Sequence, residues 1–402
     1  METLLDLNIS QLRELLKKGE ISSVELTGFY LDRIKRYDNE LGSYINITEN
    51  TAMDMAKRAD ARIAKGEEGR LLGVPLGIKD NFCAKEIETT CASQILRGFI
   101  PLYDATIIKR LKDEGFVHLG RLNMDEFAMG SSTENSSFQI TKNPWNTEYI
   151  PGGSSGGSAA ATASGLCVAS LGTDTGGSIR QPASLCGAVG TKPTYGRVSR
   201  YGVIALASSL DQIGPITRNV SDCATLMGII SGYDSMDSTS FNHNVPGYSA
   251  YLGRDIKGVR IGIPKEYNID GIEPDVKKAV DNAISFYEKN GASIVEVSLP
   301  HTEYAVAVFY VICTAEASSN LARFDGVKYG LRINGKDIID MYKKTRREGF
   351  GKEVKRRIIL GTYVLSSGYY DAYYRKASQV RTLIRRDFEE AFKRCDIIMT
   401  PV

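Results

Sequence analysis

The chain has 402 residues, which is enough for one large or two ordinary domains and for a sizeable hydrophobic core. Hydrophobic residues make up 42% of it and charged residues 24%, as in an ordinary globular protein. A formal net charge of +2 gives no signature of a nucleic-acid or membrane surface by itself.

No apolar run approaches the ~18 residues of a membrane span, and the N-terminal sequence METLLDLNIS lacks a basic and apolar signal pattern. The seven cysteines form no C-x-x-C pair, which predicts reduced thiols, a cytoplasmic location and no metal site. Five of them are interpreted as small core residues: Cys83, Cys91, Cys167, Cys186 and Cys223.

The N-terminal part of the chain predicts helices. Residues 8–36 predict two amphipathic helices, and the second opens with a capping box formed by Ser22 and Glu25. Residues 52–64 predict a third helix, because small and apolar residues recur along one face.

From Leu71 onward short apolar runs alternate with helical stretches, which favours an α/β sheet. Asp104 is expected to cap a helix that Gly115 ends. Residues 232–257 are rich in turn residues and are interpreted as a surface excursion, not a domain boundary. The other expected elements are strands at 116–119, 166–172, 258–264, 293–299 and 396–399, and helices at 274–290, 302–324 and 352–394.

Two Gly- and Ser-rich clusters, GGSSGGS at 152–158 and DTGGS at 174–178, lie on either side of the strand expected at 166–172. Such loops let the backbone approach a ligand closely and direct successive N–H groups at one point. Ser154 and Ser178 are therefore candidate nucleophiles with oxyanion donors in the same turns.

A flexible linker is the simple alternative for this composition, but residues 158–171 carry no charge and end in strand-like sequence. A phosphate-binding loop is also disfavoured, because neither cluster contains a lysine or the G-x-x-x-x-G-K-[ST] pattern.

A serine nucleophile needs a base, and none of the three histidines, His118, His243 and His301, lies in a motif-like setting. His118 is interpreted as a core or edge-strand residue. Lysine is the other workable base, when burial lowers its pKa from about 10.4 toward about 7–8. Lys79 is the candidate, since it ends the uncharged run LLGVPLGIK, although a solvated strand end would explain it as well.

Three motifs, GVPLGIKD at 73–80, PGGSSGGS at 151–158 and GTDTGGSIR at 172–180, resemble the amidase signature family in order and local pattern. The resemblance implies a Ser–cis-Ser–Lys triad. In it Ser178 is the nucleophile, Ser154 the bridging serine in a cis peptide, and Lys79 the base.

The resemblance also implies an α/β fold with one large mixed β-sheet flanked by helices on both faces. We expect a single domain over residues 1–402. It would divide into a helical N-terminal segment at 1–65, a triad-bearing core at 66–232 and a second part at 233–402.

Within the family, NMDEFAMGSS at 123–132, KPTYGRVSR at 192–200 and EVKRRI at 353–358 look like the glutaminase subunits of tRNA-dependent amidotransferases. This likeness implies a subunit that hydrolyses glutamine and supplies ammonia for converting Glu-tRNA(Gln) to Gln-tRNA(Gln), or Asp-tRNA(Asn) to Asn-tRNA(Asn). It further implies subunits B and C as partners in a heterotrimer, ATP and Mg²⁺ in one of these partners, and no cofactor in this chain.

The candidate oxyanion donors are the backbone N–H groups of Thr175, Gly176, Gly177 and Ser178. Arg357, together with Ser131, is the candidate for binding the amino-acid end of glutamine, because arginine grips carboxylates with a planar fork. Arg356 could serve equally well. The basic runs at 343–347 and 355–357 fit either a solvated helix face or contacts to a carboxylate or to tRNA phosphates.

Two other functions stay open at the level of sequence. One is a stand-alone amidase for a small amide, which the segments at 123–132 and 192–212 disfavour. The other is a catalytically silent scaffold that holds partner subunits, against which the presence of all three triad residues speaks.

The last residues, CDIIMTPV at 395–402, predict a strand that enters a Pro-containing turn where the chain ends. Since terminal residues of domains are normally polar and loosely held, this predicts a fragment whose glutamine pocket is open on one side. The resemblance implies that a further segment adds sheet, helix and an acidic residue for the α-amino group of glutamine.

Overall fold

The structure is a computed structural model that describes residues 2–402, with side chains from Leu4 onward. The chain forms two compact units. Unit 1 contains the residues up to Ala250 and Ser319–Ile358, and unit 2 contains Tyr251–Ser318 and Ile359–Val402. The first boundary falls inside the segment 232–257 that the sequence presents as a surface excursion. The single domain over residues 1–402 stays a prediction.

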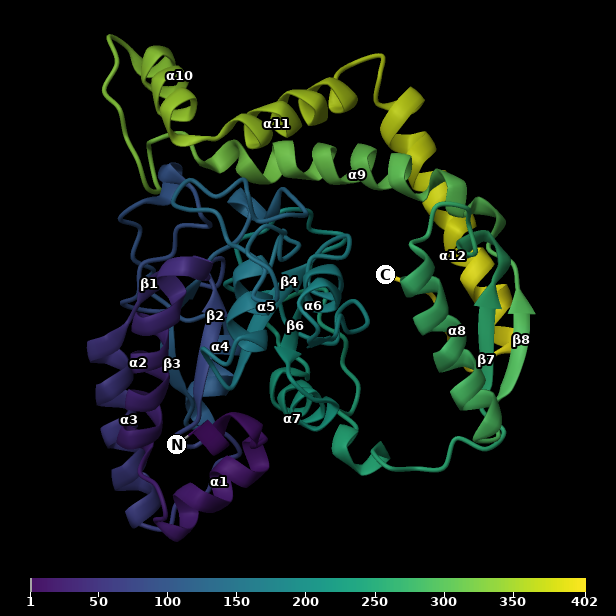
Figure 1. The fold of residues 1–402 in the computed structure, drawn as a ribbon. Coiled ribbons are helices and arrows are strands. Elements are labelled where there is room, and N and C mark those ends of the chain that lie inside the picture. Colours follow the sequence, from purple (N-terminus) through teal and green to yellow (C-terminus); the bar gives the residue numbers. More distant parts are fainter. Residues whose placement is uncertain (1) are drawn as a thin grey trace. The chain divides into compact units, whose positions relative to one another are not determined.

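Unit 1 is organised by a six-stranded mixed sheet with strand order β1-β3-β2-β4-β6-β5 (Figure 1). The central strand β2 is parallel to both of its neighbours, β3 and β4, while the remaining pairs are antiparallel. The strands are β1 (Tyr44–Ile47), β2 (Pro75–Lys79), β3 (Val117–Leu122), β4 (Ala169–Asp174), β5 (Val189–Gly190) and β6 (Gln212–Thr217). The expected strands at 116–119 and 166–172 are thus confirmed as β3 and β4, shifted toward the C-terminus.

Unit 1 also contains α1 (Ile9–Lys18), α2 (Ser23–Leu41), α3 (Glu49–Ala64), α4 (Thr106–Asp113), α5 (Gly156–Ala163), α6 (Arg180–Leu185), α7 (Val220–Ile230) and α10 (Ile338–Gly349). Several of these helices pack on the sheet. Helices α2 and α3 contact β3, whereas α5 contacts β4 and α7 contacts β6 (Figure 1). The predicted fold class, α/β with a large mixed sheet flanked by helices, is confirmed.

The first two helices begin where the sequence predicts, and α3 begins three residues before the predicted start at 52. Ser22 and Glu25 form the expected capping box at the start of α2, each accepting a backbone N–H of the other. Helix α4, by contrast, begins at Thr106 and has no side-chain cap. The Asp104 carboxylate instead accepts the Lys85 N–H (2.8 Å) and the Lys112 ammonium (2.8 Å). The predicted cap was wrong because Lys112 on the same helix captures the carboxylate.

Unit 2 contains a three-stranded parallel sheet of order β8-β7-β9, made of β7 (Arg260–Pro264), β8 (Ser293–Val297) and β9 (Ile397–Ile398). Its first helix, α8 (Pro274–Lys289), confirms the helix expected at 274–290. The two boundaries around residues 318 and 358 fall inside α9 (Ala305–Asn320) and α11 (Lys352–Leu365).

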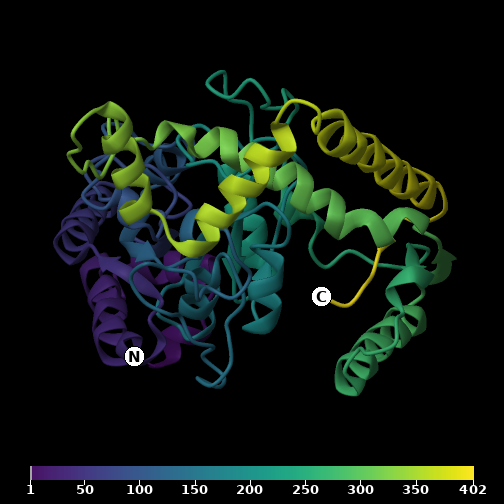
Figure 2. The same cartoon turned by 90° about the horizontal axis from the view of Figure 1, so that it is seen from above.

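The single helix expected at 352–394 is wrong. Helix α11 ends at Leu365 and α12 (Lys376–Arg394) begins after a turn of π-helix at Asp371–Arg375. Figures 1 and 2 show that the chain changes direction between them. Within residues 2–402 one helical run, Pro300–Arg323, has the length and apolarity of a membrane span, a test that the core helix of a globular protein also passes.

The largest buried side chain of unit 1 belongs to an ion pair. Asp80 and Arg121 are each 1% exposed at the side chain, and Arg121 Nε donates to Asp80 Oδ1 (3.0 Å). Arg121 also donates to the Phe82 carbonyl (2.6 Å) and to the Thr89 hydroxyl (3.1 Å). The pair therefore ties the loop after β2 to the end of β3.

We expect Arg121→Ala to lower the free energy of unfolding by about 3–5 kcal/mol, because it leaves the Asp80 charge buried without its partner. Chemical denaturation monitored by circular dichroism measures this loss. The matched control is Arg70→Ala, which breaks the surface pair Arg70–Glu114 and should cost at most about 1 kcal/mol. Equal losses in the two variants would contradict the assignment of stability to the buried pair.

Candidate active site

The topology of the sheet brings two of the three motifs together at the carboxyl ends of neighbouring strands. Strands β2 and β4 are adjacent and parallel, with Ile78 opposite Leu171, so their carboxyl ends lie side by side. Lys79 ends β2, and Asp174, the first residue of DTGGS, ends β4. Ligand sites of α/β sheets form at such carboxyl ends. The GGSSGGS loop reaches the same place, since the Ser155 N–H donates to the Ser178 carbonyl (3.1 Å).

The Lys79 side chain is 0% exposed, and its amine is surrounded by hydroxyl groups. Nζ lies 2.8 Å from Ser154 Oγ, 2.8 Å from Ser155 Oγ and 2.9 Å from Thr173 Oγ1. Burial lowers the pKa of Lys79 from 10.5 to about 7, against the opposing effect of nearby carboxylates. An amine with this pKa is partly neutral at neutral pH and can accept a proton.

The second serine of the loop restricts the hydrogen bonds of this amine. Ser155 Oγ donates its single hydrogen to the Thr173 carbonyl (3.1 Å), so toward Lys79 it can only accept. When neutral, the Lys79 amine therefore donates one N–H to Ser155 Oγ. The hydroxyls of Ser154 and Thr173 then remain for its other N–H and its lone pair.

The peptide bond between Gly153 and Ser154 is cis, as the family resemblance implies. Ser154 is fully buried, while Ser178 is 8% exposed. Within residues 2–402 no hydrogen bond joins Ser178 Oγ to Ser154 Oγ. Bonds between catalytic groups often tighten only when substrate is present.

The DTGGS loop is held by two carboxylates. Asp174 accepts the N–H groups of Gly177 (2.8 Å) and Ile179 (3.1 Å) and pairs with the Arg180 guanidinium (2.9 Å). Thr175 Oγ1 donates to Asp211 Oδ1 (2.7 Å). Of the four candidate oxyanion donors, Gly177 thus already has an acceptor for its N–H. The N–H groups of the other three have no acceptor within the part of the chain that the structure describes.

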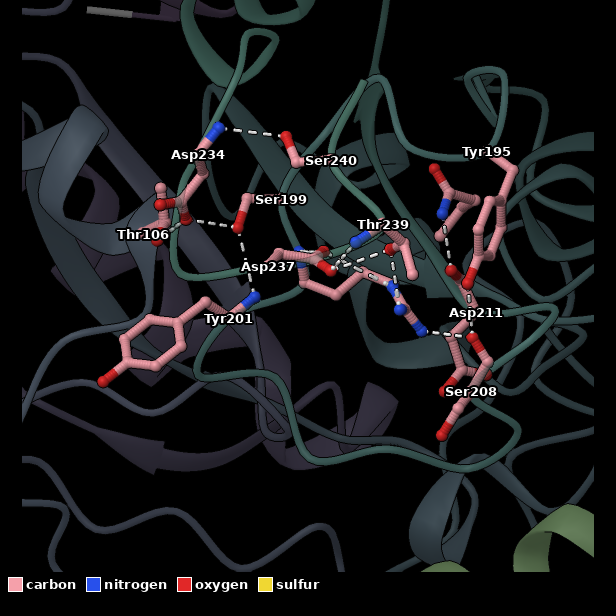
Figure 3. Close-up of polar contacts among 12 residues, drawn as sticks. Thr106, Tyr195, Ser199, Tyr201, Ser208, Asp211, Asp234, Asp237, Thr239 and Ser240 are labelled. Atoms are coloured by element: carbon pink, nitrogen blue, oxygen red, sulfur yellow. Dashed lines mark hydrogen bonds and ion pairs between the residues drawn. The ribbon is translucent and has the colours of Figure 1, made fainter. Parts of the chain in front are cut away.

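Asp211 is itself held by a polar network, shown in Figure 3. It accepts the N–H groups of Leu206 (2.9 Å) and Ala207 (3.1 Å), and burial raises its pKa to about 6. The Ser208 carbonyl in the same turn accepts the Tyr195 hydroxyl (2.7 Å) and an N–H of Arg200. Hydrogen bonds from Tyr195 and Arg200 therefore hold the turn that carries Asp211.

Arg200 connects this turn to the excursion that begins at residue 232. Its guanidinium forms an ion pair with Asp237 (3.5 Å) and donates to Thr239 Oγ1 (2.8 Å), and its backbone N–H donates to Asp237 Oδ2 (2.8 Å). Asp234 in the same segment accepts the hydroxyls of Thr106 and Ser199, both at 2.5 Å (Figure 3). The first part of the excursion is thus bonded to α4 and to the loop at 199–200 of unit 1.

The predicted substrate-binding residues lie in different settings. The Ser131 carbonyl accepts the Gln181 amide (3.1 Å), beside the Gly153–Ser154 loop. Arg357 lies on α11, is 7% exposed, and its Nε donates to Glu353 Oε1 (2.7 Å). Arg356 pairs with the same glutamate, but 56% of its side chain is exposed. Ser131 thus lies against the loop of the triad, whereas Arg357 is anchored within its own helix.

Ser155 and Thr173 were not predicted as partners of Lys79. Both stand inside the motifs, directly after Ser154 and directly before Asp174. The sequence signal that could have identified them is a hydroxyl-bearing side chain within each motif. Their contacts with Nζ depend on the pairing of β2 with β4, which spacing alone does not give.

None of the three histidines contacts Ser154 or Ser178 within residues 2–402. His118 is fully buried in β3, and its Nε2 donates to the Gly120 carbonyl (3.2 Å), which confirms it as a core residue. All seven cysteines are buried and free, so the five interpreted as core residues are confirmed. Among the described residues no group of three or more His, Cys, Asp or Glu side chains could hold a metal ion.

We expect the rate at which a glutamine-like electrophile acylates this site to rise with pH through about pH 7 and then to level off. The reason is that Lys79 accepts a proton only when neutral, and its lowered pKa of about 7 makes it neutral above that pH. Lys79→Arg should reduce the rate at least about 100-fold, because a guanidinium does not lose its proton in a protein.

Mass spectrometry of the intact protein, sampled over time at each pH, measures the acylation rate. The matched control is Lys109→Arg at an exposed position, which should label at the wild-type rate. An unchanged pH dependence in Lys79→Arg would show that another group is the base.

Comparisons with known proteins agree with this geometry. The family model described as Amidase matches residues 25–402. The chain is 60% identical over 398 residues to the A subunit of the glutamyl-tRNA(Gln) amidotransferase of Geobacter sp. strain M21, covering 99% of this chain and 82% of that protein. The corresponding protein of Thermodesulfovibrio yellowstonii is 57% identical over 395 residues, with 98% and 82% covered.

Solved structures show the same likeness. The crystal structure of the A subunit of glutamyl-tRNA(Gln) amidotransferase from Thermotoga maritima matches with a TM-score of 0.79 and 43% identity, covering 99% of this chain and 79% of that one. A chain described as part of a vestigial protein complex that reveals the origins of an s-triazine catabolic enzyme matches with a TM-score of 0.85 and 32% identity, covering 98% and 80%. The chain therefore belongs to the Amidase family.

Proposed function

We propose that this chain is the glutaminase subunit of a tRNA-dependent amidotransferase. It hydrolyses glutamine and supplies the ammonia with which Glu-tRNA(Gln) is converted to Gln-tRNA(Gln). The observation that carries the proposal is the fully buried Lys79 amine, 2.8 Å from the hydroxyl of Ser154. Relatives at 57–60% identity, named for that amidotransferase, support the substrate.

In the proposed reaction, neutral Lys79 takes the hydroxyl proton of Ser154, and Ser154 takes that of Ser178 as Ser178 Oγ attacks the side-chain amide carbon of glutamine. The C–N bond then breaks, and the proton returns through Ser154 to the leaving nitrogen, which departs as ammonia. Water attacks the resulting ester by the same proton route and releases glutamate.

The oxyanion of the tetrahedral intermediate needs N–H donors that have no other acceptor. Thr175, Gly176 and Ser178 fit this role, and each donor would contribute roughly 3–4 kcal/mol. Gly177 belongs to the same turn, but its N–H is donated to Asp174 (2.8 Å). Its part in the site is to close the turn around Ser178.

The remaining steps would take place on other chains. Subunits B and C would complete a heterotrimer in the cytoplasm, and the partner that activates the misacylated tRNA would hold ATP and Mg²⁺. This chain would need no cofactor, since a serine nucleophile, a lysine base and backbone donors suffice for amide hydrolysis. Residues 1–402 would act together as one amidase domain.

The nucleophile is tested by covalent trapping. Ser178→Ala should abolish the adduct with a glutamine-like electrophile and the hydrolysis of glutamine by the assembled complex, because the acyl group has no oxygen to bond. Peptide mapping of the wild-type adduct should place it on Ser178. The control Ser184→Ala, at an exposed serine of α6, should keep both signals. An adduct on Ser154 would reverse the roles of the two serines.

Arg357, with Ser131, is proposed to bind the amino-acid end of glutamine. Its burial and its bond to Glu353 fix the guanidinium, whereas Arg356 on the same helix is solvated. Arg357→Ala should therefore raise the KM for glutamine about 10- to 100-fold with a smaller change in kcat. Arg356→Ala is the matched control and should change KM less than about threefold. The opposite order of the two effects would assign the carboxylate to Arg356.

A further inference from the structure

Asp125 is a buried carboxylate beside the triad that the reaction above does not use. It follows β3, is 0% exposed, and accepts the N–H groups of Thr133 (3.0 Å) and Asn135 (3.2 Å). It forms no ion pair within residues 2–402. Burying a carboxylate without a cationic partner costs folding free energy. A functional role would explain why Asp125 is placed here.

The carboxylate lies directly against the segment that carries Ser154. A Cβ atom built on Gly153 would lie 2.2 Å from Asp125 Oδ2, and one on Gly130 would lie 2.3 Å from Asp125 Cγ. Only glycine fits at either place. On the backbone side, the Asp125 N–H donates to the Ser154 carbonyl (3.3 Å). Asp125 thus contacts both residues of the Gly153–Ser154 peptide.

Asp125 also acts on the Lys79 amine through its charge. Four titratable groups face Lys79 and favour its protonated form: Asp125 after β3, Asp174 at the end of β4, Asp211 before β6 and the Cys91 thiol after β2. Asp125 is the largest of these influences, although burial has the greater effect on the pKa of Lys79.

The other two carboxylates have cationic neighbours of their own. Asp174 is paired with Arg180 (2.9 Å), and the charge of Arg200 acts on Asp211. For Asp125, the cation that lowers its pKa against the effect of burial is Lys79 itself. Burial still raises the pKa of Asp125 overall, and Lys79 is the cation that opposes this effect.

We propose that Asp125 is a positioning residue, which rests on the function proposed above. Its carboxylate holds the Gly153–Ser154 segment against the Lys79 amine and keeps that amine basic enough to take the proton of Ser154. A general base works best when its pKa lies near the working pH. Burial without this carboxylate would leave Lys79 neutral but a weaker base.

The test is the pH dependence of acylation by the glutamine-like electrophile. In Asp125→Asn the loss of charge should move the acid limb of the profile to lower pH by about one unit. The plateau rate should also fall about tenfold, because the amine is less basic and the serine segment is less well held. Circular dichroism confirms that the variant folds, and Asp125→Ser removes the same charge if the Asn variant does not.

Two further variants separate position from charge. Asp125→Glu keeps the charge but cannot fit between Gly130 and Gly153, so it should lower the plateau and leave the limb near its wild-type pH. Asp222→Asn is the matched control, since Asp222 is 1% exposed, accepts the Ile9 N–H (2.8 Å) and is not among the groups that act on Lys79. It should leave both limb and plateau unchanged.

A wild-type limb and plateau in folded Asp125→Asn would overturn the inference, as would an equal change in Asp222→Asn. Failure of the proposed function looks different. In that case the wild-type protein forms no adduct, or Ser178→Ala still forms one. A lower plateau with an unmoved limb in Asp125→Asn would contradict the electrostatic half of the proposal.

Discussion

The site depends on the burial of one amine. Taking the ammonium group of Lys79 out of water disfavours its charged form, and this is the largest influence on its pKa. The surroundings oppose it only in part. The hydroxyls of Ser154, Ser155 and Thr173 hydrogen-bond to Nζ within 2.9 Å, while the carboxylates of the site form no ion pair with it within the described residues. The amine thus keeps its hydrogen bonds while its charged form is disfavoured, so that it is partly neutral at neutral pH.

Glycines make this packing possible. The GGSSGGS loop lies so close to its neighbours that a Cβ on Gly153 would meet Asp125 at 2.2 Å, and one on Gly157 would meet the Asn123 carbonyl at 2.4 Å. In the second cluster Gly177 has φ 127°, a conformation that side chains rarely adopt. Close backbone packing therefore requires the glycines of the first motif, and the positive φ requires Gly177 of the second. This requirement explains why a sequence with the composition of a linker forms a buried loop at the carboxyl ends of β2 and β4.

Local signals in the sequence predicted local structure well. The capping box at Ser22, the strand before Asp174 and the uncharged run before Lys79 each depend on neighbouring residues, and each is found in the structure. Contacts that depend on the order of the strands could not be predicted from the sequence. The pairing of β2 with β4 decides that Thr173 meets Lys79, and it joins residues more than ninety positions apart.

The misplaced elements have different causes. Asp104 has the composition of a helix cap, but an ion pair with Lys112 takes its carboxylate. The segment at 352–394 has helical periodicity throughout, yet the chain breaks it with a π-helical turn at Asp371–Arg375. At Asp104 a contact made by folding overrides a local preference, whereas the break after α11 falls at a turn that contains Gly368, whose φ is 86°.

The same sheet shows why a lysine suits this site better than a histidine. His118 in β3 is fully buried, and burial, with a smaller effect of the Arg121 charge, lowers its pKa from 6.5 to about 3. Such an imidazole is neutral but too weakly basic to take a proton from a serine at neutral pH. Lys79 is equally buried, but it starts from 10.5 and reaches about 7. In a dry pocket the lysine therefore arrives at the basicity that a histidine has in water. The hydroxyls of Ser154, Ser155 and Thr173 orient its amine by hydrogen bonds. The pairing of a buried lysine with a serine is thus the outcome that desolvation itself favours.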